Sequence, residues 1–136
     1  MSQAQGVSVT ELQEQIKGVV VGPDDPGYEE GRHVFFKGID RRPAAIANVT
    51  GADDVAKVVT AAREGGLELA VRSGGHSRAG YGTTDGGIVI DLSGLKDVDI
   101  DTDAKTAWVE TGNRAGEYMK ATAGHCLLYT SDAADE

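Results

Sequence analysis

The chain has 136 residues, of which 40% are hydrophobic and 5% aromatic, a composition that suits one packed domain or part of one. Its formal net charge of −9 argues against binding to nucleic acid or to anionic membranes, since both depend on an excess of lysine and arginine. No apolar stretch approaches the roughly 18 residues of a membrane span, and no secretory signal begins the chain, so we expect a cytoplasmic location.

The first 27 residues, 1–27, are interpreted as an N-terminal extension with one helix and one strand. Residues 8–11 have the Ser-x-x-Glu form of a capping box. Val9, Leu12 and Ile16 follow at helical spacing, which predicts a helix over residues 9–17. The next segments are predicted as a strand at residues 19–21, turns at residues 23–28 and a short irregular helix at residues 29–37.

Residues 44–71 have the pattern of a βαβ unit. Residues 44–49 and 67–71 are apolar runs typical of strands, and a helix is expected between them, from about Thr50 to the Gly65-Gly66 pair. The buried face of this helix is predicted to consist of Val55, Val58, Val59 and Ala62. Two strands joined in this way should run parallel with a right-handed crossover.

The pattern changes after this unit. Residues 86–92 predict a strand, and residues 98–101 and 106–110 alternate polar and apolar side chains around a hairpin loop. A final helix is expected to begin near Asn113 and to end before Gly124. The side chains expected in the core of this region are Trp108, Ala115, Tyr118, Met119 and Thr122. The predicted fold class is therefore α+β, with a βαβ unit followed by antiparallel strands and a helix.

The last residues, 126–136, are unlike the rest of the chain. They resemble the translated end of a transposon sequencing adapter, so we interpret them as a non-native tail and expect the native chain to continue past His125. The lone cysteine, Cys126, lies in this tail and is therefore assigned no catalytic or ligand-anchoring role. A single cysteine also excludes an intrachain disulfide.

The loop after the second strand of the βαβ unit, residues 71–82, points to chemistry. Six glycines lie between positions 74 and 87, more than a connecting turn needs. Glycines accept positive φ angles, and successive backbone N–H groups in such turns form a concave anion site. Open α/β units also bind ligands at the carboxyl ends of their strands. The loop therefore predicts a phosphate or pyrophosphate site, with charge from Arg72 and Arg78 and hydroxyl donors from Ser73 and Ser77.

This loop matches neither of two common nucleotide-binding patterns. The P-loop pattern is absent, and no Rossmann-type Gly-x-Gly-x-x-Gly leads into a helix. The spacing of His76 within the loop leaves open a structural role and a ligand contact. A metal site is not expected, because His33, His76 and His125 have no metal-ligand spacing and no partner cysteines.

Residues 72–77, Arg-Ser-Gly-Gly-His-Ser, resemble the flavin-anchoring motif of a known family. These are the FAD-linked oxidases with a PCMH-type (vanillyl-alcohol-oxidase-like) FAD-binding domain, and the most similar branch is berberine-bridge-enzyme-like. The resemblance covers about residues 28–125. It includes residues 40–46, similar to the entry into the first strand, residues 87–93, similar to the strand that closes the FAD loop, and residues 109–113, similar to the turn before a helix. Phe36 departs from the family, which often has asparagine at this position.

The resemblance implies an FAD cofactor, bound covalently by His76 through the C8 methyl group of the flavin, in a truncated PCMH-type domain at residues 28–125. The implied cofactor contacts are Arg72, Ser73, Gly74, Gly75, His76, Ser77, Gly80 and Tyr81. The implied activity is hydride transfer from an alcohol, sugar or amine-type small molecule to the flavin. Since the catalytic base and the substrate domain of such enzymes lie beyond position 125, no catalytic residue is assigned and the chain alone is expected to be inactive.

Two other functions remain compatible with the residues. The loop suits a module that binds nucleotide or phosphate without catalysis, and a structural His76 suits an interaction domain. The acidic side chains are interpreted as helix caps or hairpin residues rather than catalytic groups; they are Asp53, Asp54, Asp99, Asp101 and Asp103.

Overall fold

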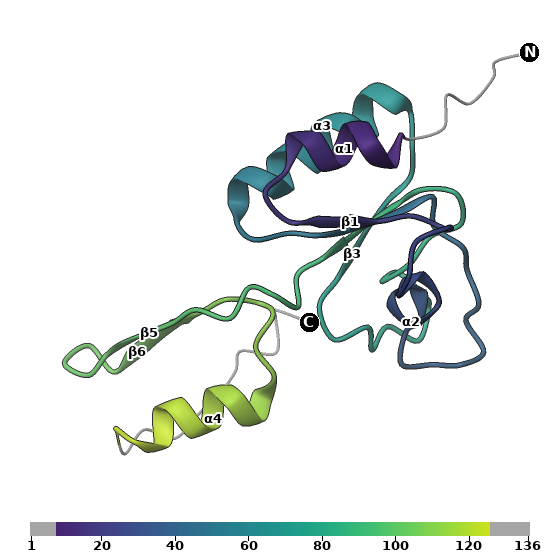
Figure 1. The fold of residues 1–136 in the computed structure, drawn as a ribbon. Coiled ribbons are helices and arrows are strands. Elements are labelled where there is room, and N and C mark those ends of the chain that lie inside the picture. Colours follow the sequence, from purple (N-terminus) through teal and green to yellow (C-terminus); the bar gives the residue numbers. More distant parts are fainter. Residues whose placement is uncertain (1–7, 126–136) are drawn as a thin grey trace, which may run out of the picture.

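The computed structural model describes residues 8–125, so the proposed tail at 126–136 falls outside it. In chain order the elements are α1 (Val9–Gln15), β1 (Val19–Val21), α2 (Tyr28–Arg32), β2 (Ala45–Asn48), α3 (Ala52–Gly65), β3 (Leu69–Arg72), β4 (Ile88–Asp91), β5 (Val98–Asp101), β6 (Thr106–Val109) and α4 (Ala115–Ala123). Strands β1 to β4 form a larger group with α1, α2 and α3, and the β5–β6 hairpin and α4 form a smaller group (Figure 1). The expected α+β class is confirmed. Within residues 8–125, no helix is long and apolar enough to cross a membrane.

The larger sheet has the strand order β1-β2-β4-β3. β2 and β3 both run parallel to β4, which confirms the predicted parallel relation of the two strands that α3 connects. β4 nevertheless lies between them, an insertion that the βαβ pattern did not predict. β1 pairs with β2 in the antiparallel direction. As a result, β3 and β4 end side by side, and Arg72 and Asp91 are register partners.

Apolar side chains cover both faces of this sheet, which explains why its central strands are continuous hydrophobic runs. One face carries α1 and α3 (Figure 1). The buried cluster on this face includes Leu12, Val58, Ala62, Ile88 and Ile90. On the other face, Tyr28 of α2 packs with Ile46, Ala70 and Val89. Val59, predicted on the buried face of α3, is 43% exposed, because the covered stripe runs through its neighbour Val58.

Helix α1 begins as predicted, since Ser8 Oγ accepts a hydrogen bond from Glu11 N–H at 3.2 Å. It ends at Gln15 instead of residue 17 because the backbone N–H groups that follow donate hydrogen bonds to a side-chain carboxylate of α3. Asp54, in the first turn of α3, accepts hydrogen bonds from Lys17 N–H at 2.8 Å and from Gly18 N–H at 3.0 Å. Those amides leave the helical pattern, and the chain turns into β1.

Asp54 has a structural role that joins α1, β1 and α3. The backbone N–H and the hydroxyl of Thr50 also donate to its carboxylate, at 3.0 and 2.8 Å. Burial alone would raise the pKa of this carboxyl, but the hydrogen bonds from Lys17, Thr50 and Gly18 outweigh it and lower the pKa from 3.8 to about 2. Asp54 thus lies inside α3 and is not its N-cap residue, which is Gly51; its carboxylate instead binds amides that precede β1 and α3. Gly18 has no room for a side chain, because a Cβ atom there would lie 2.0 Å from the Asn48 carbonyl oxygen.

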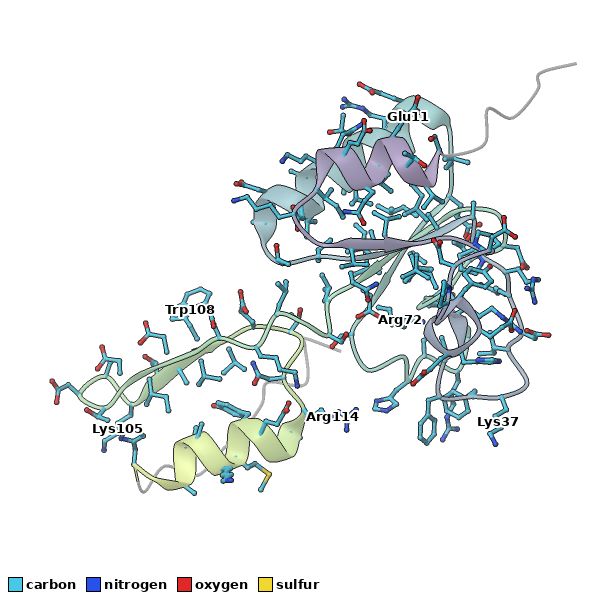
Figure 2. All side chains as sticks on the ribbon, in the orientation of Figure 1. Glu11, Lys37, Arg72, Lys105, Trp108 and Arg114 are labelled. Atoms are coloured by element: carbon cyan, nitrogen blue, oxygen red, sulfur yellow. The ribbon has the colours of Figure 1, made fainter. Side chains whose placement is uncertain are left out.

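Only one face of the β5–β6 hairpin is covered. The apolar residues of the two strands pair with one another on that face and are partly buried. Trp108 pairs with Asp99 on the opposite face, where it is 82% exposed and points away from α4 (Figure 2). Thr122 of α4 is buried, whereas Ala115 and Met119 are exposed. The predictions that Trp108, Ala115 and Met119 lie in the core are therefore wrong, because no described element covers their faces.

Helix α2 is shorter than predicted and ends at Arg32. His33 is extended, with φ −71° and ψ 143°. Beyond it, Phe35 N–H donates to the carbonyl oxygen of Gly75 at 3.1 Å. In a longer helix the Phe35 N–H would donate to a carbonyl group within the helix. The contact with the glycine-rich loop therefore requires an extended chain.

We expect Asp54→Ala to lower the free energy of unfolding by about 2 kcal/mol or more, since buried N–H groups lose a charged acceptor. The folded-state pKa of Asp54 is depressed, so its stabilisation is complete above pH 3.8 and is lost as the pH falls through about 2. Urea denaturation of variant and wild type at neutral pH and near pH 2 measures both effects.

The exposed neighbour Asp53 provides the control, because Asp53→Ala removes a carboxylate from the same turn without breaking these hydrogen bonds. An Asp54→Ala protein as stable as wild type at neutral pH would contradict the assigned role. So would an equal loss of stability at both pH values.

Candidate functional site

The glycine-rich loop leaves the carboxyl end of β3 and returns to the start of β4. Its first residues lie beside the carboxyl end of β4, because the two strands are parallel neighbours. Open α/β sheets bind ligands at this edge. Arg72 marks the junction between sheet and loop in Figure 2.

A buried ion pair attaches the loop to the sheet. The Arg72 guanidinium donates to one carboxylate oxygen of Asp91, from Nε at 3.0 Å and from Nη2 at 2.6 Å, and the two side chains are 8% and 9% exposed. Burial alone would raise the pKa of Asp91, but hydrogen bonds from Ser93 and Arg72 outweigh it and lower the pKa. Nη1 of Arg72 also donates to the His33 carbonyl oxygen at 3.3 Å. The charge of Arg72, which the sequence offered to a phosphate, is thus neutralised inside the fold, whereas Arg78 is exposed.

Two glycines let the loop turn in a way that other residues rarely allow. Gly75 and Gly80 have φ angles of +68° and +79°. The Gly80 carbonyl oxygen accepts a hydrogen bond from Arg41 Nη1 at 2.9 Å, and a Cβ atom at Gly80 would lie 3.3 Å from that guanidinium. Gly80 is buried and does not line the pocket that includes Tyr81, so its implied contact with the cofactor stays a prediction.

Two hollows border the loop, and both are lined by Ser73 and His76. The first has a volume of about 950 Å³ and also includes Gly74. The second, of about 700 Å³, also includes Arg72, Gly75, Ser77 and Tyr81. His76 is exposed, and Tyr81 is 79% exposed. The structure therefore brings the residues singled out in the sequence, apart from Gly80, to one surface.

The two serines of the motif differ in what their hydroxyls can offer. Ser73 Oγ donates to the carbonyl oxygen of Thr111, so its proton is used within the protein. Ser77 Oγ accepts a hydrogen bond from Tyr81 N–H at 3.2 Å, which leaves its own proton to donate to a ligand. The predicted role of hydroxyl donor therefore suits Ser77 better than Ser73.

The far wall of the first hollow consists of residues that sequence reasoning did not assign to a site. They are Ser93, Lys96 and the segment 112–117 at the start of α4, and Phe35, which lies beside His76, is a further lining residue that was not assigned. Gly112 allows this segment to approach, since a Cβ atom there would lie 2.3 Å from the Leu92 carbonyl oxygen. The turn at residues 109–113 was a usable sequence signal for this wall, whereas nothing in the local pattern connects Phe35 with the loop.

Charges on this wall are partly paired. Glu117 accepts hydrogen bonds from Arg114 N–H and from Lys96 Nζ, both at 2.7 Å, and these two contacts lower the pKa of its carboxyl. The Arg114 side chain extends from the start of α4 toward the larger group of elements (Figure 2). It therefore adds positive charge at the first hollow.

The chemistry of this surface suits a ligand with both a flat ring system and phosphate groups. A turn rich in backbone amides offers an anion site, and an exposed imidazole stands between the hollows next to Phe35, which is 67% exposed. Among residues 8–125, no group of three or more His, Cys, Asp or Glu side chains is arranged to hold a metal ion.

Comparisons with known proteins agree with such a ligand. A family model described as "FAD binding domain" matches residues 43–136. (R)-6-hydroxynicotine oxidase of Paenarthrobacter nicotinovorans is 42% identical over 114 residues, or 79% of this chain and 24% of that protein. Berberine bridge enzyme-like 9 of Arabidopsis thaliana is 35% identical over 91 residues, or 65% of this chain and 17% of that protein. The solved structure of BBE-like 1 from Physcomitrella patens has a TM-score of 0.81 at 26% identity, over 87% of this chain and 26% of that chain. The chain spans about a quarter or less of the length of these relatives.

We expect Arg72→Met to lower the free energy of unfolding by about 3–5 kcal/mol, because Asp91 would remain as a buried charge without a partner. Combining it with Asp91→Leu should recover most of the loss, since the double variant buries no charge. Chemical denaturation of the wild type, both single variants and the double variant gives the coupling energy. Equal stability of Arg72→Met and the double variant would show that the unpaired carboxylate is not the cause.

Proposed function

This chain belongs to the FAD binding domain family, and from that premise we propose that it is the N-terminal part of an FAD-dependent oxidoreductase whose flavin is covalently held by His76. Residues 28–125 form the first part of its PCMH-type FAD domain, and residues 126–136 are non-native. The protein acts in the cytoplasm. The Arg-Ser-Gly-Gly-His-Ser motif of residues 72–77 and the match of the family model support the FAD-binding part of this proposal. The family match extends through residues 126–136, so the non-native tail and the location rest on the sequence interpretation alone.

The observation that best supports the proposal is the position of His76 at the surface, between the two hollows. Its imidazole is exposed and borders both hollows, whereas a structural histidine would be enclosed by its hydrogen-bond partners. When bound, FAD supplies a ring that accepts a hydride from the substrate. The contribution of this chain is to bind, orient and retain that ring.

The loop binds the pyrophosphate through its backbone. The backbone N–H groups of residues 73–77 lie around the positive-φ turn at Gly75 and provide uncharged hydrogen-bond donors. The Ser77 hydroxyl donates one further hydrogen bond, and Arg114 supplies positive charge from the opposite wall. This division of roles follows from the ion pair with Asp91, which neutralises the charge of the Arg72 guanidinium.

His76 forms the covalent bond through one imidazole nitrogen. The nitrogen that carries a lone pair in the neutral ring would bond to the C8 methyl carbon of a bound flavin. The imidazole would give up its N–H hydrogen and the methyl carbon one hydrogen, and the two electrons and two protons released would pass to an external electron acceptor. The bond prevents dissociation of the cofactor.

The substrate is a small molecule with an alcohol, sugar or amine group. The described residues build the cofactor side of the site, and the substrate pocket and the catalytic base belong to sequence beyond position 125. A chain of this length leaves the flavin half exposed, so we propose that it is inactive alone. This chain covers only 24% of one relative and 26% of another, which supports this division.

We expect the full-length protein to remain yellow after acid precipitation and to carry the added mass of one FAD. His76→Ala should bind FAD reversibly and release all of it on precipitation, because the bonding nitrogen is gone. Mass spectrometry of the denatured protein and absorbance of the supernatant measure the two fractions. His33→Ala is the matched control, since His33 is exposed but borders neither hollow, and it should keep the covalent flavin.

Undiminished covalent flavin in His76→Ala would refute the anchor. Reversible nucleotide binding by the wild type, without any covalent flavin, would instead favour the module that binds nucleotide without catalysis. If the protein binds neither flavin nor phosphate, the remaining hypothesis is an interaction domain in which His76 has a structural role.

A further inference from the structure

An aromatic side chain packs directly on the proposed anchor. The rings of Phe35 and His76 lie with their centroids 5.0 Å apart and their planes at 86°, an edge-to-face contact. Such contacts are the preferred geometry for aromatic pairs, because the positive edge of one ring meets the negative face of the other. The contact restricts the imidazole, which is otherwise exposed.

Phe35 is itself held in place by two further contacts. Its backbone N–H donates to the carbonyl oxygen of Gly75, the residue just before His76, at 3.1 Å. Its ring packs edge-to-face on Phe36 at 5.2 Å, and the guanidinium carbon of Arg78 lies 5.9 Å from the centre of the Phe36 ring. The Phe35 ring is therefore tied to the loop on both sides of His76.

Phe35 is exposed to solvent although its contacts with His76, Gly75 and Phe36 fix its position. Its ring is 67% exposed and lines the first hollow, together with Ser73, Gly74 and His76. A large apolar ring at the edge of a polar loop is costly to leave in water. A flat aromatic ligand in the hollow would cover it.

We propose that Phe35 is a positioning residue for attachment of the flavin. It orients the His76 imidazole so that one nitrogen faces the first hollow, and it forms the apolar contact against which the methyl-bearing edge of the flavin rests. This inference rests on the proposed function. Phe35 takes no part in bond formation; its effect is on the orientation of His76.

The test compares Phe35→Ala and Phe35→Tyr with wild type in the full-length protein. Flavin-free protein is mixed with FAD, covalent attachment is followed over time by mass spectrometry, and the non-covalent dissociation constant is measured by quenching of flavin fluorescence. Phe35→Ala should slow attachment about three- to tenfold, the effect of losing one aromatic pair, with a smaller change in the dissociation constant. Phe35→Tyr keeps the ring and should restore the wild-type rate.

A second readout needs no flavin. The ring current of Phe35 should displace the NMR signals of the His76 ring protons, and Phe35→Ala should abolish this displacement while Phe35→Tyr retains it. Trp108→Ala is the matched control, because Trp108 is also an exposed aromatic residue but lies on the uncovered face of the hairpin. It should change neither the attachment rate nor the His76 signals.

Attachment in Phe35→Ala at the wild-type rate would overturn this inference and leave the anchor role of His76 intact. Equally slow attachment in Phe35→Ala and Phe35→Tyr would overturn it as well, because the ring would then not be what matters. Absence of covalent flavin in the wild type would refute the proposed function itself, and this inference with it.

Discussion

The buried ion pair between Arg72 and Asp91 is the constraint on which the rest of the site depends. Two charges withdrawn from water are tolerated only where close geometry and further hydrogen bonds compensate them. Here Ser93 N–H also donates to Asp91 at 2.8 Å, and Arg72 also donates to the His33 carbonyl oxygen. The pair therefore fixes the ends of β3 and β4 together with the extended segment that follows α2. The glycine-rich loop and the Phe35 contact both start from these fixed points.

The two most buried acidic groups of the described chain thus serve geometry and not catalysis. Asp54 accepts hydrogen bonds from backbone amides after α1 and before α3, and Asp91 accepts them from a guanidinium; in both, hydrogen bonds outweigh burial and lower the pKa of the carboxyl. His76 has the opposite setting, with an exposed ring in contact with Phe35. The paired charges thus lie below the surface, while the imidazole above them is accessible and restricted by its contact with Phe35.

Local patterns predicted the elements whose form is decided by neighbours in sequence. Helix α3 ends at the predicted glycine pair, where Gly66 adopts the left-handed conformation with φ 62°. The position of β4 could not be predicted, because strand order depends on pairing between distant segments. Trp108 shows a second limit: alternation separates two faces of a hairpin but does not reveal which one is covered. In the site, glycine content located the loop and a family motif singled out His76. Phe35 contacts Gly75 through a hydrogen bond between residues far apart in the chain, and no local sequence pattern indicates such a contact.

The insertion of β4 between two earlier strands has a consequence for how the protein is assembled. β2 and β3 precede β4 in the chain but do not pair with each other, so the central strand pairs of the sheet form only when β4 inserts between them. Pairing of this non-local kind is intrinsically slow, because loop closure must precede the contacts that reward it. The ligand-binding loop takes its shape only with this closing step, since Asp91 arrives on β4. A dinucleotide that binds only the finished loop would therefore stabilise the folded state by mass action.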